Sequence, residues 1–463
     1  MNRTWLLLAA GTALGGFYAY EQVRSFRRPG PDGHGGGQRP RVVILGGGFG
    51  GLAAANALGR HGAGTVDVLL IDKNNYHLFT PPLFQVAACG VNPWDVAHPI
   101  RPIGKRNGYR FRCAEVDGID LDGRHIGIAS GQPIDYDYLI VALGSTTNYF
   151  HQADAEKYGL PLKSVEDALD VRNRVLDAVE QASRETDAAL RRELLTFVIV
   201  GGGATGVEVA GAMRDLIYEI LAREYQDLDL SLVKIVVIES RDRLLGHVGG
   251  SLARASLRHL TGSGVEVMLG TKVRRVQQDL VETDDGRIIR ARTIIWTAGV
   301  QANELAEELD VPKGKGNSLK VDEYLRLADR TNAFAVGDIA SFQDPDTGEP
   351  TPLLASVAIQ QGKAAAGNVL RAIRGQDLIP FHYHHFANMV SLGRNAGAAE
   401  LDGLTFTGLA GWLLWKTVHL ALLTGFRDKL GIAMDWAFSY FNRQDTSRLR
   451  IEEQKTPVPS RPT

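Results

Sequence analysis

Two glycine-rich motifs, each placed directly after an apolar run, constrain this chain more than any other feature. The runs and their glycines are, in order, RVVIL (41–45) with Gly46, Gly48 and Gly51, and LTFVIV (195–200) with Gly201, Gly203 and Gly206. Each motif predicts a buried strand, a turn that only glycine can make, and a helix whose N-terminus binds a pyrophosphate. The chain is therefore predicted to hold two dinucleotides; the alternative is a glycine turn that merely packs.

An acidic residue should end the second strand of each unit and bind a ribose hydroxyl. The run VDVLLID ends at Asp72, 21 residues after Gly51, close to the expected spacing of about 20. In the second unit SLVKIVVIES supplies Glu239, 33 residues after Gly206, because the helix between them is expected to be long. A carboxylate on the ribose diol repels a 2′-phosphate, so Glu239 favours NADH over NADPH.

Composition excludes several classes of function. The 463 residues carry 51 basic and 53 acidic side chains, a formal charge of −2 that gives no attraction toward nucleic acid. The two cysteines, Cys89 and Cys113, are too far apart in sequence for a close-spaced redox disulfide or a cysteine-rich zinc site. Electron transfer would therefore rely on a bound cofactor.

The N-terminus departs from a globular composition. Residues 5–20, WLLLAAGTALGGFYAY, carry no charge, and three arginines occur between this run and residue 28. An uncleaved anchor, a cleaved signal peptide and an interfacial targeting segment all stay open, and the basic excess after the run favours a cytoplasmic position for the downstream domains. The Gly/Pro-rich stretch at 27–40 is predicted to be a tether.

The order strand, glycine turn, helix, acid-ended strand, closing strand and glycine occurs twice. The closing strands are YLIVALG (138–144) with Gly144 and RTIIWTAGV (292–300) with Gly299, and a helix is expected from Ser164 to about Arg192. We predict an α/β protein with two Rossmann-like domains, the second inserted in the first. The expected divisions are 1–40 (anchor and linker), 41–163 and 301–375 (first nucleotide domain), 164–300 (second nucleotide domain) and 376–463 (C-terminal strands and helices).

A glycine and an aspartate end the strand in NAFAVGDIASF (332–342). Gly337 would allow close approach of a flavin nucleotide, and the Asp338 carboxylate could accept hydrogen bonds from the hydroxyl groups of its ribityl chain. The alternative is an ordinary turn aspartate.

With these motifs the chain resembles flavoproteins with two dinucleotide-binding domains, and within them the type II NADH:quinone oxidoreductases. The motifs that carry the resemblance span about Arg41 to Phe441: VVILGGGFGGLAAA, NYHLFTPPLFQVA, YDYLIVALGSTTNYF, GGGATGVEVAG, IIWTAGV, FAVGDIA and GWLLWKTVHLALLTGFRDKL. The resemblance implies FAD, bound without a covalent link, in the Gly46 loop and NADH as a substrate in the Gly201 loop. It also implies a membrane quinone as electron acceptor, in a respiratory electron-transport chain.

The family's quinone-site motif is similar to ASVAIQQG (355–362), with Gln360 and Gln361 in its paired-glutamine positions. Ser356 stands where the family usually has a first glutamine, which puts the way the quinone ring is held in doubt. The alternative is a helix over the flavin with both glutamines facing solvent. Lys363 directly follows the motif and is a candidate cationic partner near the flavin ring.

Glu208 lies two residues after the last glycine of the second motif. The resemblance places this helix position beside the flavin ring, where a carboxylate can order the nicotinamide site or relay protons. The alternative is an exposed glutamate in the first helical turn, stabilised by the helix dipole.

The C-terminal part combines apolar and aromatic residues. GLAGWLLWKTVHLALLTGF (408–426) is interrupted by two basic residues, while Leu430, Met434, Ala437 and Phe441 have the spacing of one helix face. Lipid contact by this amphipathic segment is predicted, with Trp412, Trp415 and Trp436 and nearby basic residues, Arg448 among them, at the headgroups. The alternative for the stripe is an interface with a domain or with a second copy in a homodimer.

Taken together, the residues and the resemblance predict an NADH:quinone oxidoreductase that does not pump protons, on the cytoplasmic face of a bacterial inner membrane. A metal site is not expected, because the histidines of FHYHHF (381–386) would alternate between the faces of a strand. Two alternatives remain: a redox-switched interaction protein of the apoptosis-inducing-factor kind, and a sulfide:quinone reductase, for which the cysteines look misplaced.

Overall fold

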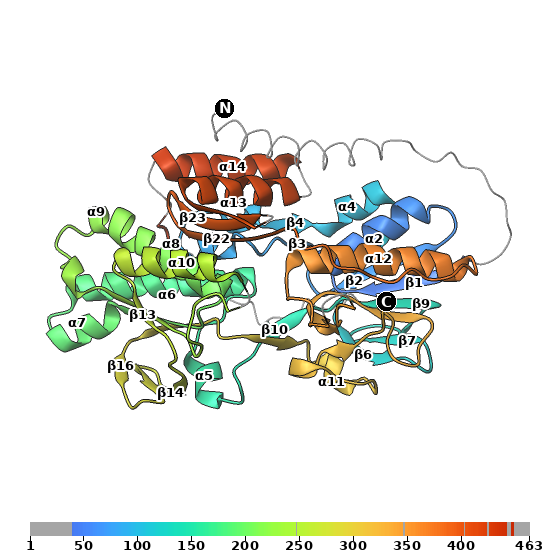
Figure 1. Cartoon of the computed structure of the whole chain (residues 1–463), viewed down its shortest axis with the longest axis horizontal. Coiled ribbons are helices and arrows are strands. Elements are labelled where there is room, and N and C mark those ends of the chain that lie inside the picture. Colours follow the sequence, from blue (N-terminus) through green and yellow to red (C-terminus); the bar gives the residue numbers. More distant parts are fainter. Residues whose placement is uncertain are drawn as a thin grey trace, which may run out of the picture.

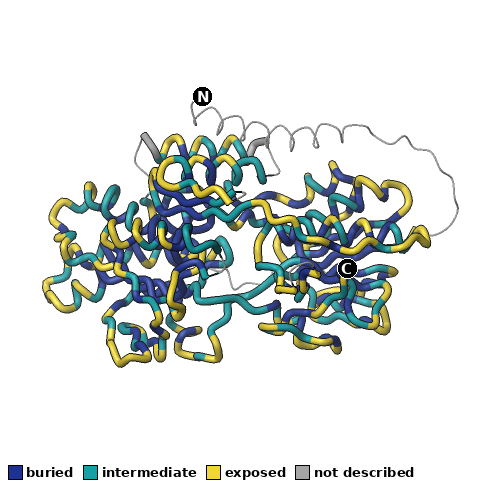
Figure 2. The backbone as a smooth tube through the Cα atoms, in the orientation of Figure 1, coloured by how far each residue is buried: buried dark blue, intermediate teal, exposed yellow. Residues whose placement is uncertain are grey.

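A computed structural model describes residues 39–246, 248–345, 348–401, 403–423, 426–441 and 446–448. The apolar run at 5–20 and most of the Gly/Pro tether lie outside the described residues. Figure 1 shows two lobes side by side, one blue and orange and the other green and yellow, with the red C-terminal helices above the second. Buried backbone follows the sheets of both lobes (Figure 2).

The first lobe is built on a five-stranded parallel sheet in the order β20-β9-β1-β2-β5. Its strands are β1 (Arg41–Leu45), β2 (Asp67–Asp72), β5 (Arg110–Cys113), β9 (Tyr138–Val141) and β20 (Ala333–Ala335). Helices α2 (Phe49–His61) and α12 (Ala355–Ile373) pack against each other in this lobe. Val42 to Leu45 are fully buried, as expected for a parallel strand with both faces covered.

The second lobe contains a four-stranded parallel sheet in the order β13-β12-β11-β17. Its strands are β11 (Thr196–Val200), β12 (Lys234–Ile238), β13 (Glu266–Met268) and β17 (Thr293–Trp296). The helix after the second glycine motif is long, as predicted: α8 (Ala204–Asp215) continues through a π-helical turn at Leu216–Leu221 into α9 (Ala222–Glu224). All four strands lie in sequence between β9 and β20, so the chain returns to the first sheet after completing the second.

The closing strand of the second unit differs from its prediction. The segment 292–300 forms β17 and then, after a break, β18 (Val300–Ala302), which pairs antiparallel with β10 (Ser145–Thr147). This short ribbon joins the two lobes where the chain passes between them. Antiparallel sheets flank it in each lobe: β6-β7-β8 and β14-β15-β16. Their bounds are Val116–Asp120, His125–Ile128, Ile134–Asp135, Val273–Val276, Leu280–Thr283 and Ile288–Arg290.

The helix expected from Ser164 to about Arg192 is two helices, so that prediction was wrong in part. α6 (Val165–Arg184) begins with a capping box between Ser164 and Asp167, and α7 (Ala188–Leu194) begins after Asp187, which accepts the Ala189 and Leu190 N–H groups. Glu185 accepts the N–H groups of Thr186 and Asp187 between them. Local side-chain bonds therefore compete with the helical ones and divide the segment.

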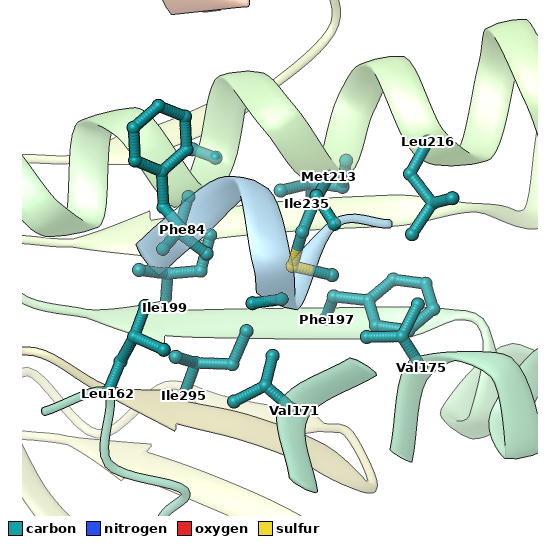
Figure 3. Packing of buried hydrophobic residues seen from close by; sticks show 14 of the residues in the cluster. Phe84, Leu162, Val171, Val175, Phe197, Ile199, Met213, Leu216, Ile235 and Ile295 are labelled. Carbon is teal, nitrogen blue, oxygen red and sulfur yellow. The ribbon is translucent and has the colours of Figure 1, made fainter. Parts of the chain in front are cut away.

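The stretch at 74–90, rich in aromatic residues and proline, contains two short elements. β3 (Tyr76–Leu78) pairs with β4 (Ala97–Pro99), and α3 (Leu83–Ala87) comes next after β3. Phe84 of α3 joins the core of the second lobe beside Ile199 and Ile295 (Figure 3). This contact ties an early segment of the chain to the second sheet.

The C-terminal part is a three-stranded antiparallel sheet covered by two helices. Its elements are β22 (Ala387–Gly393), β23 (Ala396–Leu401), β24 (Leu404–Gly408), α13 (Leu409–Leu422) and α14 (Phe426–Phe441). β22 packs on α8, and α13 packs on β23 (Figure 1). The remaining elements include α4 (Ile100–Asn107), α5 (Ala153–Tyr158), α10 (Gly250–Gly262), α11 (Leu305–Glu308), β19 (Leu319–Lys320) and β21 (Ala340–Ser341).

Candidate active site

The first glycine loop has the geometry of an anion-binding turn. Gly46 has φ +100°, a conformation that L side chains rarely adopt, and a Cβ on Gly51 would collide with the carbonyl oxygen of Gly46. Around Gly48 no atom of the described residues comes within 4 Å of where a Cβ would lie. The N-terminus of α2, which has no side-chain cap, therefore opens onto a space where a phosphate can approach the backbone.

The second glycine loop repeats these features. Gly201 has φ +109°, and a Cβ on Gly206 would collide with the carbonyl oxygen of Gly201. Gly203 precedes α8, whose N-terminus has no side-chain cap. No atom of the described residues lies within 4 Å of where a Cβ on Gly203 would be. Both loops thus have the form of a dinucleotide cradle.

The two predicted acids make matching hydrogen bonds to the loops. Asp72 accepts the N–H of Gly47 on Oδ2 (2.6 Å) and the N–H two residues ahead of itself on Oδ1 (2.7 Å). Glu239 accepts the N–H of Gly202 on Oε2 (2.7 Å) and again the N–H two residues ahead on Oε1 (2.9 Å). Both oxygens of Asp72 and Oε2 of Glu239 keep a lone pair for a ribose hydroxyl, whereas Oε1 of Glu239 also accepts the Ser240 hydroxyl (3.2 Å). Burial raises the pKa of Asp72, which the two backbone bonds oppose.

Gly337 and Asp338 lie at a turn between β20 and α12. Gly337 has φ +76°, and its N–H donates to Oε1 of Gln361 (2.7 Å). Asp338 accepts the hydroxyl of Ser145 (2.6 Å), and Lys163 donates to that hydroxyl (2.9 Å). Asp338 is thus part of a polar chain from two other segments. Sequence reasoning missed Ser145, although it directly follows Gly144, and Lys163, for which no local signal exists.

The two closing glycines differ in conformation. Gly144 has φ +70°, whereas the φ of Gly299 is negative or extended, and a Cβ on Gly299 would meet the ring of Phe150 at 3.1 Å. Both lead into the ribbon formed by β10 and β18. They therefore lie where the two lobes meet.

The paired glutamines are not both at the surface of α12. Gln361 is 1% exposed, and its Nε2 has no hydrogen-bond partner among the described residues. A buried amide donor without a partner is costly, so an acceptor from a bound group fits this position. Gln360 is half-buried and bonds both backbone groups of His384, at 3.0 and 3.1 Å. The alternative of two solvent-facing glutamines is wrong for Gln361.

The other residues of that motif have different surroundings. The Ser356 hydroxyl lies 3.4 Å from that of Tyr383, which lies 3.1 Å from Nδ1 of His385.

Lys363 is exposed on α12. The histidines at 381–386 are in an irregular segment and not in a strand, which corrects that expectation. Among the described residues no group of three or more His, Cys, Asp or Glu side chains could hold a metal ion.

Glu208 is buried and not an exposed first-turn residue, so the dipole-stabilised surface alternative is wrong. It is 9% exposed, and its Oε1 accepts the N–H of Ser391 on β22 (3.1 Å) and the indole N–H of Trp415 on α13 (3.0 Å). Burial raises its pKa to about 8, although both hydrogen bonds favour the charged form. Burial therefore favours the protonated form of the carboxyl near neutral pH.

An aromatic cluster surrounds this carboxyl on the C-terminal side. Trp415 stacks on His419 at 4.1 Å between ring centroids and contacts the Phe84 ring edge-on at 5.7 Å. Burial lowers the pKa of His419 to about 4, so its ring is neutral. Trp415 gave no sequence signal for a contact with Glu208, since 207 residues separate them.

A cavity of about 490 Å³ lies beside this cluster, between α3, α8 with its π-helical turn, and α13. Its walls include Phe84, Asp215, Ser391, Trp412 and Lys416. The Lys416 ammonium lies 4.0 Å from the Trp412 ring centroid and 4.6 Å from that of Trp436. Burial and then the charge of Arg394 lower the pKa of Lys416 to about 7.

Two of the three tryptophans assigned to lipid headgroups are inside the protein. Trp415 is 1% exposed and Trp436 is 9% exposed, and Trp436 donates to the side chain of Gln85 (2.7 Å). Arg448, also assigned to lipid, pairs with Asp177. The two tryptophan assignments were wrong because an aromatic residue on an apolar helix packs equally well on protein, whereas lipid contact by Arg448 stays a prediction.

Known proteins resemble this chain over most of its length. The sequence profile described as pyridine nucleotide-disulphide oxidoreductase matches residues 40–362. Two type II NADH:quinone oxidoreductases of Mycobacterium tuberculosis are 32% and 34% identical, over 90% and 88% of this chain and 91% and 88% of their own lengths. A solved structure of NDH2 from Plasmodium falciparum in complex with NADH has a TM-score of 0.81, covering 89% of this chain and 100% of that one. At 20% identity this likeness concerns the fold.

Proposed function

The chain belongs to the pyridine nucleotide-disulphide oxidoreductase family and, within it, to the type II NADH:quinone oxidoreductases, and from this we infer that it oxidises NADH and reduces a quinone. The observation that carries the inference is the pair of matching loops with their acids, together with a buried carboxyl on the helix of the second loop. One loop can retain a flavin while the other exchanges a nicotinamide.

We propose that FAD occupies the Gly46 loop. The open space around Gly48, the spare lone pairs of Asp72 and Asp338, and the orphaned Nε2 of Gln361 fit its pyrophosphate, hydroxyl and acceptor groups. When bound, the flavin would accept a hydride from NADH and pass two electrons to the quinone. The protein's part is to position both nucleotides and to supply protons.

NADH is proposed for the Gly201 loop, with Glu239 on its ribose. Oε2 of Glu239 is held by the Gly202 N–H of the loop, and Oε1 by the N–H of Arg241. A 2′-phosphate would meet this negative charge at close range, so NADPH should bind more weakly.

Glu208 is proposed as the proton donor for quinone reduction. A donor should have a pKa near the working pH, and the value of about 8 meets that condition. The same helix carries the second glycine loop and Glu208, so a nucleotide bound at one end lies close to the carboxyl.

The quinone is proposed to approach between α12 and the C-terminal part. Gln361 and Gln360 both form hydrogen bonds with backbone groups. This suits a role in shaping the quinone site more than in binding the quinone ring directly. Lys363 near the ring stays a prediction, as does the absence of proton pumping.

Membrane contact is proposed for the outer face of α13 and α14. Side chains on this face are 46–54% exposed although apolar: Leu409, Leu413, Leu430, Met434 and Phe438. Exposed apolar side chains gathered on two neighbouring helices are typical of a surface that binds lipid or protein. None of the described helices is both long and apolar enough to cross a bilayer. A cytoplasmic position on a bacterial membrane stays a prediction, and a homodimer through the same face is the competing one.

One experiment tests the function. The protein is purified from membranes, its flavin spectrum recorded, and NADH or NADPH added without oxygen, and then a short-chain quinone. We expect bleaching by NADH and rapid reoxidation by quinone over repeated cycles. A long-lived charge-transfer complex that no quinone reoxidises would instead support a redox-switched interaction protein. Sulfide-dependent bleaching would support a sulfide reductase, although Cys89 is buried and Cys113 exposed.

A further inference from the structure

Gly47 follows the first glycine of the first motif, and side chains hold both its backbone N–H and its carbonyl oxygen. The N–H of Gly47 donates to Asp72 (2.6 Å), and its carbonyl oxygen lies 2.8 Å from Nδ1 of His77. Because a carbonyl only accepts, Nδ1 of His77 carries the hydrogen. His77 comes from β3, outside the strand–turn–helix unit; it lies in the motif NYHLFTPPLFQVA, which gave it no role of its own.

The second loop holds the equivalent residue differently. The N–H of Gly202 donates to Glu239 (2.7 Å), as in the first loop, but its carbonyl accepts the backbone N–H of Leu245 (2.8 Å). Leu245 has φ +52°, a conformation that costs a non-glycine residue about 1 kcal/mol or more. The hydrogen bond to the carbonyl after the first motif glycine thus comes from a side chain in the first loop and from strained backbone in the second.

The surroundings of His77 keep its ring fixed. It is 2% exposed and meets the Phe49 ring edge-on at 4.9 Å between centroids. Across the β3–β4 ladder it faces His98, at 6.4 Å between ring centroids. Burial lowers the pKa of His77 to about 4, so the ring is neutral under ordinary conditions.

The bond to Gly47 determines where the next N–H points. In a trans peptide the C=O of one residue and the N–H of the next are antiparallel. Fixing the carbonyl of Gly47 toward His77 therefore directs the N–H of Gly48 away from His77, and Gly48, the N-cap of α2, borders open space where a Cβ would lie. That space is where the flavin pyrophosphate is proposed to bind.

We propose that His77 is a positioning residue for FAD: its Nδ1–H orients the peptide between Gly47 and Gly48 so that the Gly48 N–H meets the pyrophosphate. This proposal rests on the assignment of FAD to the first loop. It gives the histidine of the aromatic stretch a role in cofactor retention, without contact between its side chain and the cofactor.

The test compares two substitutions that differ in where they place a donor. In His77→Asn the amide nitrogen lies near the position of Nδ1, whereas in His77→Gln it lies near that of Nε2. We expect His77→Asn to keep FAD affinity within a few-fold of the wild type, and His77→Gln to weaken it about 10-fold, the effect of one lost bond to a buried carbonyl. The readouts are the FAD-to-protein ratio after purification and the Kd for FAD added back to stripped protein.

Two controls separate this role from general damage to the fold. NADH affinity should be the same in both variants, because the second loop does not use His77, and His98→Asn should retain FAD because it leaves the His77–Gly47 bond in place. Equal FAD affinities in His77→Asn and His77→Gln would overturn the proposal. If instead wild-type protein carries no FAD, the proposed function fails, and that result is visible before any variant is made.

Discussion

The two glycine loops make the same turn and bind the same kind of acid, yet the helices that come after them have different neighbours. α2 packs on α12, where a Cβ on Gly362 would collide with the carbonyl oxygen of Gly50. α8 packs on β22, where a Cβ on Gly211 would collide with the carbonyl oxygen of Leu392. The loop therefore specifies that a dinucleotide binds, while the element packed on the helix specifies what surrounds the bound molecule.

This difference explains why only the second helix carries a buried carboxyl. The close approach of β22 to α8 brings the Ser391 N–H to Glu208, and α13, which packs on the same sheet, brings Trp415. On the first helix, α12 supplies Gln361, which fixes the Gly337 turn. These surroundings fit the proposal that the first loop retains FAD and that the second exchanges NADH beside Glu208 as proton donor.

The largest effect should come from Glu208→Gln, which leaves both loops intact and removes the ionisable proton. We expect turnover with quinone to fall about 100-fold, the usual range for loss of a general acid, while FAD content and NADH affinity change little. Stopped-flow rates of the two half-reactions provide the measurement. Unchanged rates in both would show that the difference between the two helices has no part in the chemistry.

Next in size is the matched pair Gly51→Ala and Gly206→Ala, which breaks each loop in turn. In both, the new Cβ collides with a backbone oxygen that cannot move away, an overpacking cost equivalent to about 10- to 100-fold in affinity. Gly51→Ala should lose FAD and Gly206→Ala should lose NADH binding but stay yellow. If Gly206→Ala also lost FAD, the two loops would not be independent.

A smaller effect is expected from the acids. Glu239→Ser removes the charge that opposes a 2′-phosphate, so the ratio of kcat/KM for NADH to that for NADPH should fall about 10-fold. Asp72→Ser should leave that ratio unchanged and lower FAD retention instead. Steady-state kinetics with both nucleotides distinguish the outcomes, and a shift of the ratio in Asp72→Ser would reverse the assignment of the loops.

The smallest effect concerns Trp415→Phe, which keeps an aromatic ring and removes one hydrogen bond to Glu208. That bond favours the charged carboxylate, so its loss raises the pKa of Glu208 further above about 8. Because the protonated form is the donor, activity falls as pH rises through the pKa, and the alkaline limb should move to higher pH by up to about one unit. A limb that stays in place would mean that another group controls it.

The features predicted from the sequence are those set by residues near one another. The glycine turns, Asp72 and Glu239 are recognisable from strand patterns and short spacings, and the parallel α/β fold is recognisable with them. Glu208 was selected only by resemblance, since nothing in TGVEVAG shows that its side chain is buried.

The features that could not be predicted depend on packing between distant segments. Trp415 reaches Glu208 because glycine at position 211 lets β22 touch the helix backbone, a contact that no periodicity reveals. The same limit explains why Trp436, on a helix with an apolar face, was assigned to lipid although it bonds Gln85. The break between α6 and α7 was missed because its cause is a pair of side-chain caps rather than a loss of apolar pattern.

The position of Trp415 places α13 between an exposed apolar surface and the buried carboxyl of Glu208. The helix presents Leu409 and Leu413 outward and holds the indole against Glu208 on its inner side, so the two surfaces are separated by about 10 Å, one helix diameter. Any binding at the outer face that displaced α13 would therefore also move the indole that donates to Glu208. The proposed membrane contact of the C-terminal part and the acidity of Glu208 would then be coupled through a single helix.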